Sequence, residues 1–423
     1  MNSPLRIIVN GLIAQHYTLG GVTWDYLQYL IGLKQLGHDV YYLEDSGEWP
    51  YNTDGGISGN DWVARDCDKN INYLNKVLSR YGFEDRWSYF FPPESKWYGL
   101  PNSKRKSIIA SADLLINVSG ALAKPSKYEA VKKLIYIDSD PGFTQVKLKL
   151  KLKKFIKRVA AHQVHFSFGE NLPDELTTDS DYNWIPTRTP IVLSEWKSEV
   201  QFENVYTTIM NWTSYRSRKY KGKIYGQKDI EFVKFIELKN KLKNIDFEVA
   251  MTKLSHKNWE SAIEHLIPEY NIDIHNSFKN PADLLSHYGW KIVDAEEKCG
   301  DIDSYRKYIF HSKGEWSVSK SGYVTSKPGW FSCRSACYLA AGKPVIVQDT
   351  GFDKVIPVGE GVLQFSTIEE ATEAIREVEA RYGFHSKRAL EIADEYFDSA
   401  KVLKKLIEQS FANPNSHIKQ VTS

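Results

Sequence analysis

The sequence predicts an α/β protein made of two tandem domains in which strands and helices alternate. The alternation begins with an apolar strand at 6–9 and begins again with a second strand at 206–210. Between the two series, Pro186 and Pro190 interrupt regular structure and mark the linker. A chain of 423 residues has room for two or three ordinary domains. Strands that alternate with helices form parallel sheets, whose functional loops follow the carboxyl ends of the strands.

The first series of elements is read from apolar runs and from helical spacing. A polar, glycine-containing loop at 10–21 leads into a helix at 22–36 that carries apolar residues at helical spacing. The elements expected after it are a strand at 39–43, a long loop at 46–65, a helix at 66–81, and strands at 113–118, 134–138 and 165–168. The last of these strands is expected to close the first half.

The second series repeats this pattern over the rest of the chain. The expected strands are 206–210, 247–251 and 290–293, and the expected helices are 229–242, 261–270, 302–310, 368–382 and 387–409. The tail after residue 413 is polar and is expected to fray.

Composition excludes several classes of protein. The hydrophobic fraction of 42% and the charged fraction of 26% are typical of a globular protein, and the net charge of +2 does not point to nucleic acid or membrane. None of the four cysteines forms a CxxC pair, so no zinc site is expected, and free thiols fit a reducing cytoplasm. The N-terminus runs directly into the first strand, and no apolar run approaches the ~20 residues that span a bilayer. We therefore expect no signal peptide and no integral membrane segment, but a cytoplasmic location, with peripheral contact to the inner face of a membrane as the alternative.

The stretch 329–352 carries the strongest functional signal. It reads as a Gly/Ser turn, a short helix of small residues, a Gly-Lys-Pro stop, a buried strand and a polar loop. Ser332 is placed as the helix N-cap, with Arg334 and Ser335 in the first turn, and a helix start beside an arginine binds anions. The loop residues able to hydrogen-bond sugar hydroxyls are Gln348, Asp349 and Thr350. Together these features predict a site for a sugar-nucleotide diphosphate, with a capped structural helix and an ordinary turn as the alternatives.

Four stretches of the chain resemble glycosyltransferases of the GT-B fold, in which two Rossmann-like domains face each other across a cleft. The segment 339–347 is similar to the A-x-G-x-P-V stretch that follows the diphosphate-binding helix of these enzymes. The other similar segments are 358–363 with the helix after it, 394–409, and 20–40. The resemblance implies an acceptor-binding domain at 1–188, a nucleotide-sugar-binding domain at 189–395, and a C-terminal segment at 396–423 whose helix can cross back to the first domain.

The resemblance also implies roles for residues of the second domain. The loop at 211–216 would approach the pyrophosphate, with Asn211 and Arg216 as candidate contacts, and Lys223 and Lys228 as weaker candidates. Glu315 precedes the donor helix and could hold the base or ribose. The co-substrate would be a nucleoside-diphosphate sugar, such as a UDP-sugar, with no tightly bound cofactor and no metal ion. The retaining branch of the family carries two glutamates near the donor helix, and Gly329 and Cys337 stand at those places here.

The absence of this glutamate pair favours an inverting transfer, which needs a general base on the acceptor side. His16, in the loop after the first strand, resembles the His or Asp base of inverting members. Asp25 on the following helix could orient it, and Gly20 and Gly21 would let a ligand approach the helix start. The alternatives are that His16 is an ordinary loop residue and that Asp25 is a solvated surface residue.

Asp138 and Asp140 end a buried strand and are spelled like the DxD metal motif of the other major glycosyltransferase fold. Two tandem βα domains argue against that fold. We therefore expect these carboxylates to bind the acceptor, with Asp138 as an alternative base, or else to cap a turn.

The segment 147–158 predicts a basic helix, which is either solvated or docks an anionic partner. The acceptor could be a small molecule, a glycan or a lipid-linked molecule, with DNA as an alternative that uses this basic face. The other functions left open are a sugar-nucleotide epimerase, a phosphorylase, and a non-catalytic binding protein on the same fold.

Overall fold

The computed structural model describes residues 3–51, 64–178, 180–252, 278 and 280–412. The helix predicted at 261–270 and most of the loop predicted at 46–65 lie outside these residues. Within the described ranges, no helix is both long and apolar enough to cross a membrane.

The first half of the chain forms an eight-stranded sheet in the order β4-β3-β2-β1-β5-β6-β7-β8. Its strands are β1 (Arg6–Asn10), β2 (Asp39–Glu44), β3 (Trp87–Phe91), β4 (Lys96–Gly99), β5 (Leu114–Val118), β6 (Leu134–Asp138), β7 (Val164–Ser167) and β8 (Trp184–Pro186). All neighbours are parallel except the β3–β4 pair at the edge. Its helices are α1 (Gly20–Gln35), α2 (Asp68–Arg80), α3 (Asn102–Ser111), α4 (Phe143–Lys149), α5 (Lys153–Ala160) and α6 (Asp174–Thr177). Central strands such as β5 and β6 are buried along their whole length, which explains why they read as continuous apolar runs.

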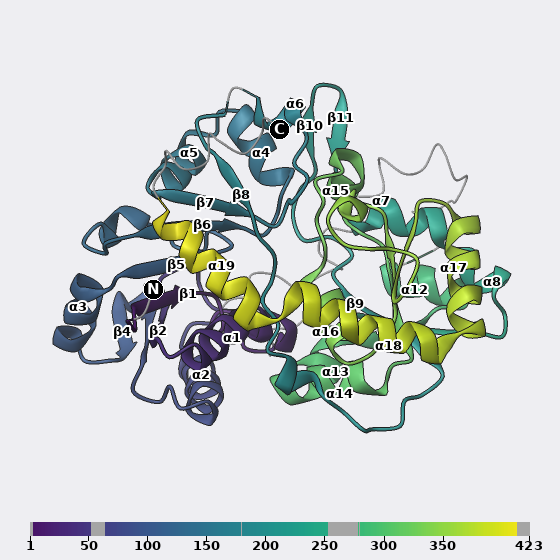
Figure 1. Cartoon of the computed structure of the whole chain (residues 1–423), viewed down its shortest axis with the longest axis horizontal. Coiled ribbons are helices and arrows are strands. Elements are labelled where there is room, and N and C mark those ends of the chain that lie inside the picture. The colour runs from purple at the N-terminus through teal and green to yellow at the C-terminus, as the bar shows by residue number, and fades with distance from the viewer. Residues whose placement is uncertain (1–2, 52–63, 179, 253–277, 279, 413–423) are drawn as a thin grey trace.

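The second half forms a six-stranded parallel sheet in the order β13-β12-β9-β14-β15-β16. Its strands are β9 (Val205–Met210), β12 (Asp246–Met251), β13 (Lys291–Asp294), β14 (Gly314–Ser317), β15 (Val345–Gln348) and β16 (Val362–Phe365), and a separate hairpin pairs β10 (Arg218–Tyr220) with β11 (Lys223–Tyr225). Its helices are α7 (Lys228–Phe232), α8 (Leu238–Lys241), α12 (Pro281–His287), α13 (Ala295–Cys299), α14 (Ile302–His311), α15 (Ser321–Ser326), α16 (Cys333–Ala340), α17 (Ile368–Ala380), α18 (Tyr382–Ile392) and α19 (Ser399–Phe411). Figure 1 shows the two halves side by side. The α/β prediction with two parallel-sheet domains is confirmed.

Some predicted elements differ from the observed ones. The strand at 165–168 is not the last of its half, because Trp184–Pro186, predicted as a break, pairs with β7 as the edge strand β8. A proline can end an edge strand, where its missing N–H leaves no ladder bond unmade. The basic segment at 147–158 is two helices rather than one, since Lys151 between α4 and α5 has a φ of 53°. The helix predicted at 387–409 is divided into α18 and α19, because α18 ends in a π-helical segment at Ala393–Phe397 and the backbone leaves the helix at Asp398, whose ψ is 122°.

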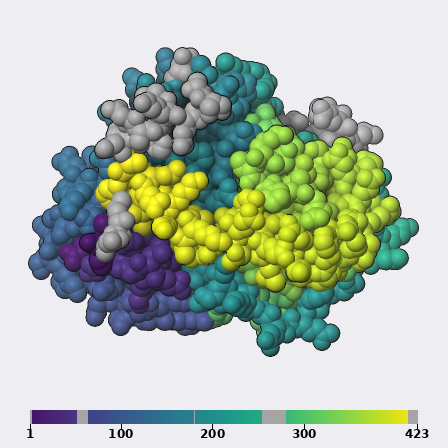
Figure 2. All heavy atoms as spheres, viewed as in Figure 1, coloured from purple at the N-terminus to yellow at the C-terminus, as the bar shows by residue number. Residues whose placement is uncertain are grey.

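The C-terminal helix α19 returns to the first half of the chain. It packs on α1, where Gly32 lets it come so close that a β-carbon there would lie 2.6 Å from Leu403. Figures 1 and 2 show the yellow segment crossing from the second half to lie against the purple N-terminal elements. The expected crossing helix is therefore present, while the domain boundaries at 188/189 and 395/396 stay predictions.

Candidate active site

A cavity of about 390 Å³ lies where the carboxyl ends of the two sheets meet. The first sheet contributes the residues that follow β5, β6 and β7, and the second contributes those that follow β9, β12 and β14. The lining of the cavity includes Gly20, Gly21, Asp25, Ser119, Ser139, Asp140, Asn211, Lys228, Lys320, Ser332, Cys333 and Arg334. Because strand-end loops of both sheets meet here, the cavity is the expected ligand site of this architecture.

Arg334, on the first turn of α16, is the most firmly placed cation of the cavity. Its Nε donates to Glu315 at 2.6 Å, its Nη1 to the carbonyl of Ile209 at 2.6 Å, and its Nη2 to the hydroxyl of Ser317 at 2.8 Å. Although burial opposes the charge, the Glu315 carboxylate raises the pKa of Arg334. A guanidinium has five N–H groups, so these three hydrogen bonds leave two for a ligand. The structure thus presents a fixed, charged fork to the cavity.

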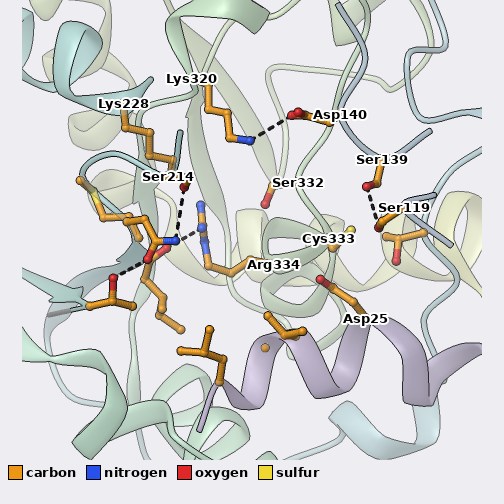
Figure 3. Close-up of a pocket in the computed structure, with 18 of the residues that line it drawn as sticks. Asp25, Ser119, Ser139, Asp140, Ser214, Lys228, Lys320, Ser332, Cys333 and Arg334 are labelled. Carbon is orange, nitrogen blue, oxygen red and sulfur yellow. Dashed lines mark hydrogen bonds and ion pairs between the residues drawn. The ribbon is translucent and has the colours of Figure 1, made fainter. Parts of the chain in front are cut away.

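Two lysines add basic side chains to the same space (Figure 3). Burial and the nearby Arg334 charge lower the pKa of Lys228 well below its usual value. Lys320 forms an ion pair with Asp140 at 2.9 Å and donates to the hydroxyl of Tyr215 at 3.0 Å. The cavity therefore combines three basic side chains with two carboxylates, Asp25 and Asp140, along its described lining.

The start of α16 faces the cavity, as the sequence predicts. Ser332 occupies the N-cap position without a side-chain capping bond, and it lines the cavity with Cys333 and Arg334. Gly329, just before it, has a φ of 76° and fits closely against the backbone of Asn171 from the first half. The N–H groups of a helix's first turn have no partner within the helix and attract anions. This end of α16 adds to the attraction that the Arg334 side chain provides.

Several residues predicted to bind the donor do not reach the cavity. Glu315 is fully buried and acts through Arg334. Gln348 is buried between the Ser319 N–H at 3.0 Å and Glu231 at 2.7 Å, and Ser335 is fully buried.

The polar side chains of the loop after β15 also bond to other protein groups. Asp349 pairs with Lys327, and Thr350 donates to the carbonyl of Trp330, so both shape the loop that precedes α16. Arg216 is exposed and does not line the cavity, whereas Asn211 does. Gln348, Asp349 and Thr350, which were predicted to bind sugar hydroxyls, therefore form contacts within the protein outside the cavity lining.

In the first half of the chain, α1 approaches the second half closely. A β-carbon on Gly20 would lie 2.2 Å from the backbone oxygen of Asp301, and one on Gly21 would lie 2.8 Å from the ring of Tyr305. These two glycines thus permit contact between the halves as well as lining the cavity. One turn further along α1, burial raises the pKa of Asp25 to about 7, against the opposing effects of the Cys333 thiol and the Arg334 cation.

Asp140 joins the two halves across the cavity. It accepts hydrogen bonds from the hydroxyls of Tyr215 and Tyr323 and pairs with Lys320, and all three donors belong to the second half. Burial opposes its charge, but Lys320 and Lys147 hold the pKa of its carboxyl below the usual value. Asp140 is thus an ionised cross-bridge at the edge of the site.

Asp138 and His16 lie outside the cavity lining. Asp138 is buried and accepts from Thr144 at 2.7 Å, Gln145 at 3.0 Å and Ser167 at 2.9 Å, so it fixes the turn that carries Asp140. His16 packs on the ring of Tyr51, with centroids 4.5 Å apart, and burial lowers its pKa to about 4. Neither candidate base lines the cavity with Arg334, Lys228 and Lys320, and their catalytic roles stay predictions.

Sequence reasoning missed Lys320 and the two tyrosines that share Asp140 with it. Lys320 follows β14, so the rule that strand-end loops carry function could have found it. Tyr215 lies in the loop at 211–216 that is expected to approach the pyrophosphate. Neither Tyr215 nor Tyr323 was singled out, because tyrosines more often fill cores.

The arrangement of the chain is similar to that of solved glycosyltransferases. An alpha-glucosyltransferase in complex with UDP-glucose and DNA containing an abasic site aligns with a TM-score of 0.57 and 12% identity, covering 97% of this chain and 100% of that one. HepE of Anabaena in complex with UDP and glucose aligns with a TM-score of 0.56 and 10% identity, covering 96% and 99%. A glycosyltransferase from Rickettsia africae aligns with a TM-score of 0.50 and 14% identity, covering 97% and 98%.

No protein-family model and no curated protein sequence matches the chain. At these identities the structural similarity establishes the fold, which is the two-domain GT-B arrangement that the sequence resemblance implied.

Proposed function

We propose that the chain is a glycosyltransferase that moves a sugar from a UDP-sugar to an acceptor hydroxyl. The observation that carries the proposal is the Arg334 fork, held by Glu315 at the N-terminal end of α16 and opening on a cavity between two parallel sheets. The similar solved structures hold UDP or UDP-glucose, which supports a uridine diphosphate as the ligand.

The charges of the cavity match a diphosphate. Arg334, Lys228 and the N-terminal end of α16 all belong to the second half of the chain and line the cavity. A diphosphate carries at least two negative charges, and fixed donors around it stabilise the charge that develops as the glycosidic bond breaks. Arg334 and the helix start would supply this stabilisation in a metal-independent reaction.

Asp25 is the residue we propose as general base of an inverting transfer, in place of His16. It lines the cavity from the acceptor side, and its carboxyl, with a pKa raised to about 7 by burial, is half-ionised near neutral pH. A base is most effective when its pKa lies near the working pH. His16 does not line the cavity, and burial lowers its pKa to about 4.

A turnover assay tests the proposal. UDP release from UDP-glucose and from other UDP-sugars is measured with and without a panel of hydroxyl acceptors, and the product is analysed by NMR. The proposal expects acceptor-dependent UDP release, with the anomeric configuration of the sugar reversed. Release of UDP without any acceptor, together with an altered sugar, would favour the epimerase instead.

The UDP-sugar site and the role of Asp25 as inverting base can be rejected independently. A product that keeps the donor's configuration would reject Asp25 as the inverting base but leave the UDP-sugar site standing. No turnover and no binding of any UDP-sugar would reject the function itself.

A further inference from the structure

A second hollow, of about 480 Å³, lies beside the first on the acceptor side. Ser119, Ser139 and Asp140 line both, so the two spaces adjoin along the loops after β5 and β6. Figure 3 shows Ser119 and Ser139 together at this boundary, and the hydroxyl of Ser139 donates to that of Ser119 at 2.7 Å. A molecule that reaches into one hollow can therefore extend into the other.

Four basic side chains from three elements surround the second hollow. They are Lys147 of α4, Lys154 and Arg158 of α5, and Arg218 of β10. Because β10 belongs to the second half and the two helices to the first, the hollow is completed only when the halves are together. The glycine-like turn at Lys151, with a φ of 53°, sets α5 at an angle to α4 and brings both helices to the same space.

The positive charge of this hollow is only partly balanced by the protein, through the Asp138 and Asp140 carboxylates near Lys147. None of the four cations forms an ion pair within the described part of the chain. The Nε of Arg218 is buried without a hydrogen-bond partner. Burial lowers the pKa of Lys147. The nearby Asp140 and Asp138 carboxylates oppose this shift, and the charges of Arg218 and Lys320 add to it.

The two carboxylates of the lining are already engaged. Asp140 pairs with Lys320 and accepts from two tyrosines, and Asp138 accepts from Thr144, Gln145 and Ser167. The four cations therefore remain available to an anion, and the buried, unpartnered nitrogen of Arg218 is a donor without an acceptor. Such a donor costs free energy unless a ligand or water satisfies it.

We infer that the second hollow binds a phosphate group of the acceptor, so that the acceptor is a phosphate-bearing molecule whose hydroxyl reaches the first cavity. The inference rests on the proposed function for the direction of transfer, and on the four cations for the chemical class. Lysines and a forked arginine are the side chains that recognise phosphate.

Inorganic phosphate is the probe that tests the inference, titrated by calorimetry into protein saturated with UDP so that the first cavity is filled. The double variant Lys154→Ala/Arg158→Ala removes two lining cations. Its matched control, Lys153→Ala/Lys157→Ala, removes two exposed cations from the same helix that do not line the hollow. We expect the first variant to weaken phosphate binding at least about tenfold, and the control to change it less than twofold.

Two phosphate results overturn the inference: no binding to the unmodified protein, or equal weakening in the two variants. A DNA result also overturns it. In that case a DNA duplex binds with equal dependence on Lys153 and Lys157 and on the lining pair, while phosphate binding is unchanged in both variants. The last outcome would assign α5 to a nucleic-acid surface. A separate UDP titration without phosphate distinguishes failure of the inference from failure of the proposed function. If UDP does not bind, the proposed function fails, whereas a loss of phosphate affinity in Lys154→Ala/Arg158→Ala that is absent from Lys153→Ala/Lys157→Ala still supports the second hollow.

Discussion

The guanidinium of Arg334 is held in one orientation by hydrogen bonds to its neighbours in the fold. Glu315, the carbonyl of Ile209 and Ser317 hold three of its N–H groups, so little side-chain freedom remains to be lost on binding. The sequence predicted Arg334 and Ser332 because a helix start is visible in a pattern of Ser, small residues and Gly-Lys-Pro. The sequence did not predict that Gln348 and Asp349, in the segment after this helix, stay outside the cavity lining. Their tertiary contacts with Glu231 and Lys327 decide this, and such contacts cannot be read from the sequence.

The carboxyl of Asp25 should set the lower limb of the pH–rate profile. Its pKa is raised to about 7, so the fraction of active base, and with it kcat, should rise as the pH increases through 7. Asp25→Asn should lower kcat about 10²- to 10⁴-fold and abolish this limb. The pH dependence of kcat is measured with UDP-sugar and acceptor.

The buried carboxyl of Asp229 offers a control for that profile. Its pKa is also raised to about 7 by burial, yet it does not line the cavity. Asp229→Asn should keep the limb, and a profile that is lost in this variant but kept in Asp25→Asn would contradict the assignment.

Lys228 should take up a proton when a diphosphate binds. Burial and Arg334 hold its pKa well below the usual value in the free protein, and a bound anion would raise it again. Calorimetry of UDP binding in buffers of different ionisation enthalpy, over a range of pH, should show proton uptake that is absent in Lys228→Met. Equal uptake in the variant would assign the proton to another group.

At the scale of elements, α1 links the site to the rest of the fold. Its first turn fits against residues 299–305 of the second half, and its middle packs on α19 through Gly32. The sequence predicted both helices from apolar periodicity, since α19 buries one face of apolar residues. It did not predict the break between α18 and α19, or the edge strand β8, because turn geometry and edge pairing depend on contacts distant in sequence.

The contact between α19 and α1 should contribute measurably to stability. Leu403 is fully buried against α1, so Leu403→Ala should lower the free energy of unfolding by about 3 kcal/mol through lost contacts and a cavity. The matched control is Lys404→Ala, an exposed change on the same turn of α19. Urea unfolding measures both, and equal midpoints for the two variants would show that α19 does not hold the halves together.

At the scale of the whole molecule, two parallel sheets present their carboxyl ends to one cavity, and Asp140 ties them across it. The resemblance to GT-B enzymes predicted this arrangement, and the solved structures with the same fold bear it out. The cross-bridge itself could not be read from the sequence, because its donors lie at 215, 320 and 323, far from Asp140 along the chain.

The Asp140 bridge should stabilise the protein at neutral pH and lose its effect in acid. The pKa of this carboxyl is held below its ordinary value, so its contribution is present above that ordinary value and disappears as the pH falls through the lowered one. Asp140→Asn should therefore cost about 2 kcal/mol at pH 7 and much less near pH 3. Glu369→Gln, which removes an exposed ion pair, is the control, and a pH-independent loss in Asp140→Asn would contradict the bridge.

The most direct test of the central claim is the affinity for UDP compared with that for UMP, measured by isothermal titration calorimetry. If Arg334 and the start of α16 hold a diphosphate, UDP should bind at least about tenfold more tightly than UMP, and Arg334→Ala should remove most of this difference. Arg376→Ala, which changes an exposed arginine on α17, should leave it intact. Equal affinities for UDP and UMP in the unmodified protein, or a difference that survives Arg334→Ala, would contradict the account.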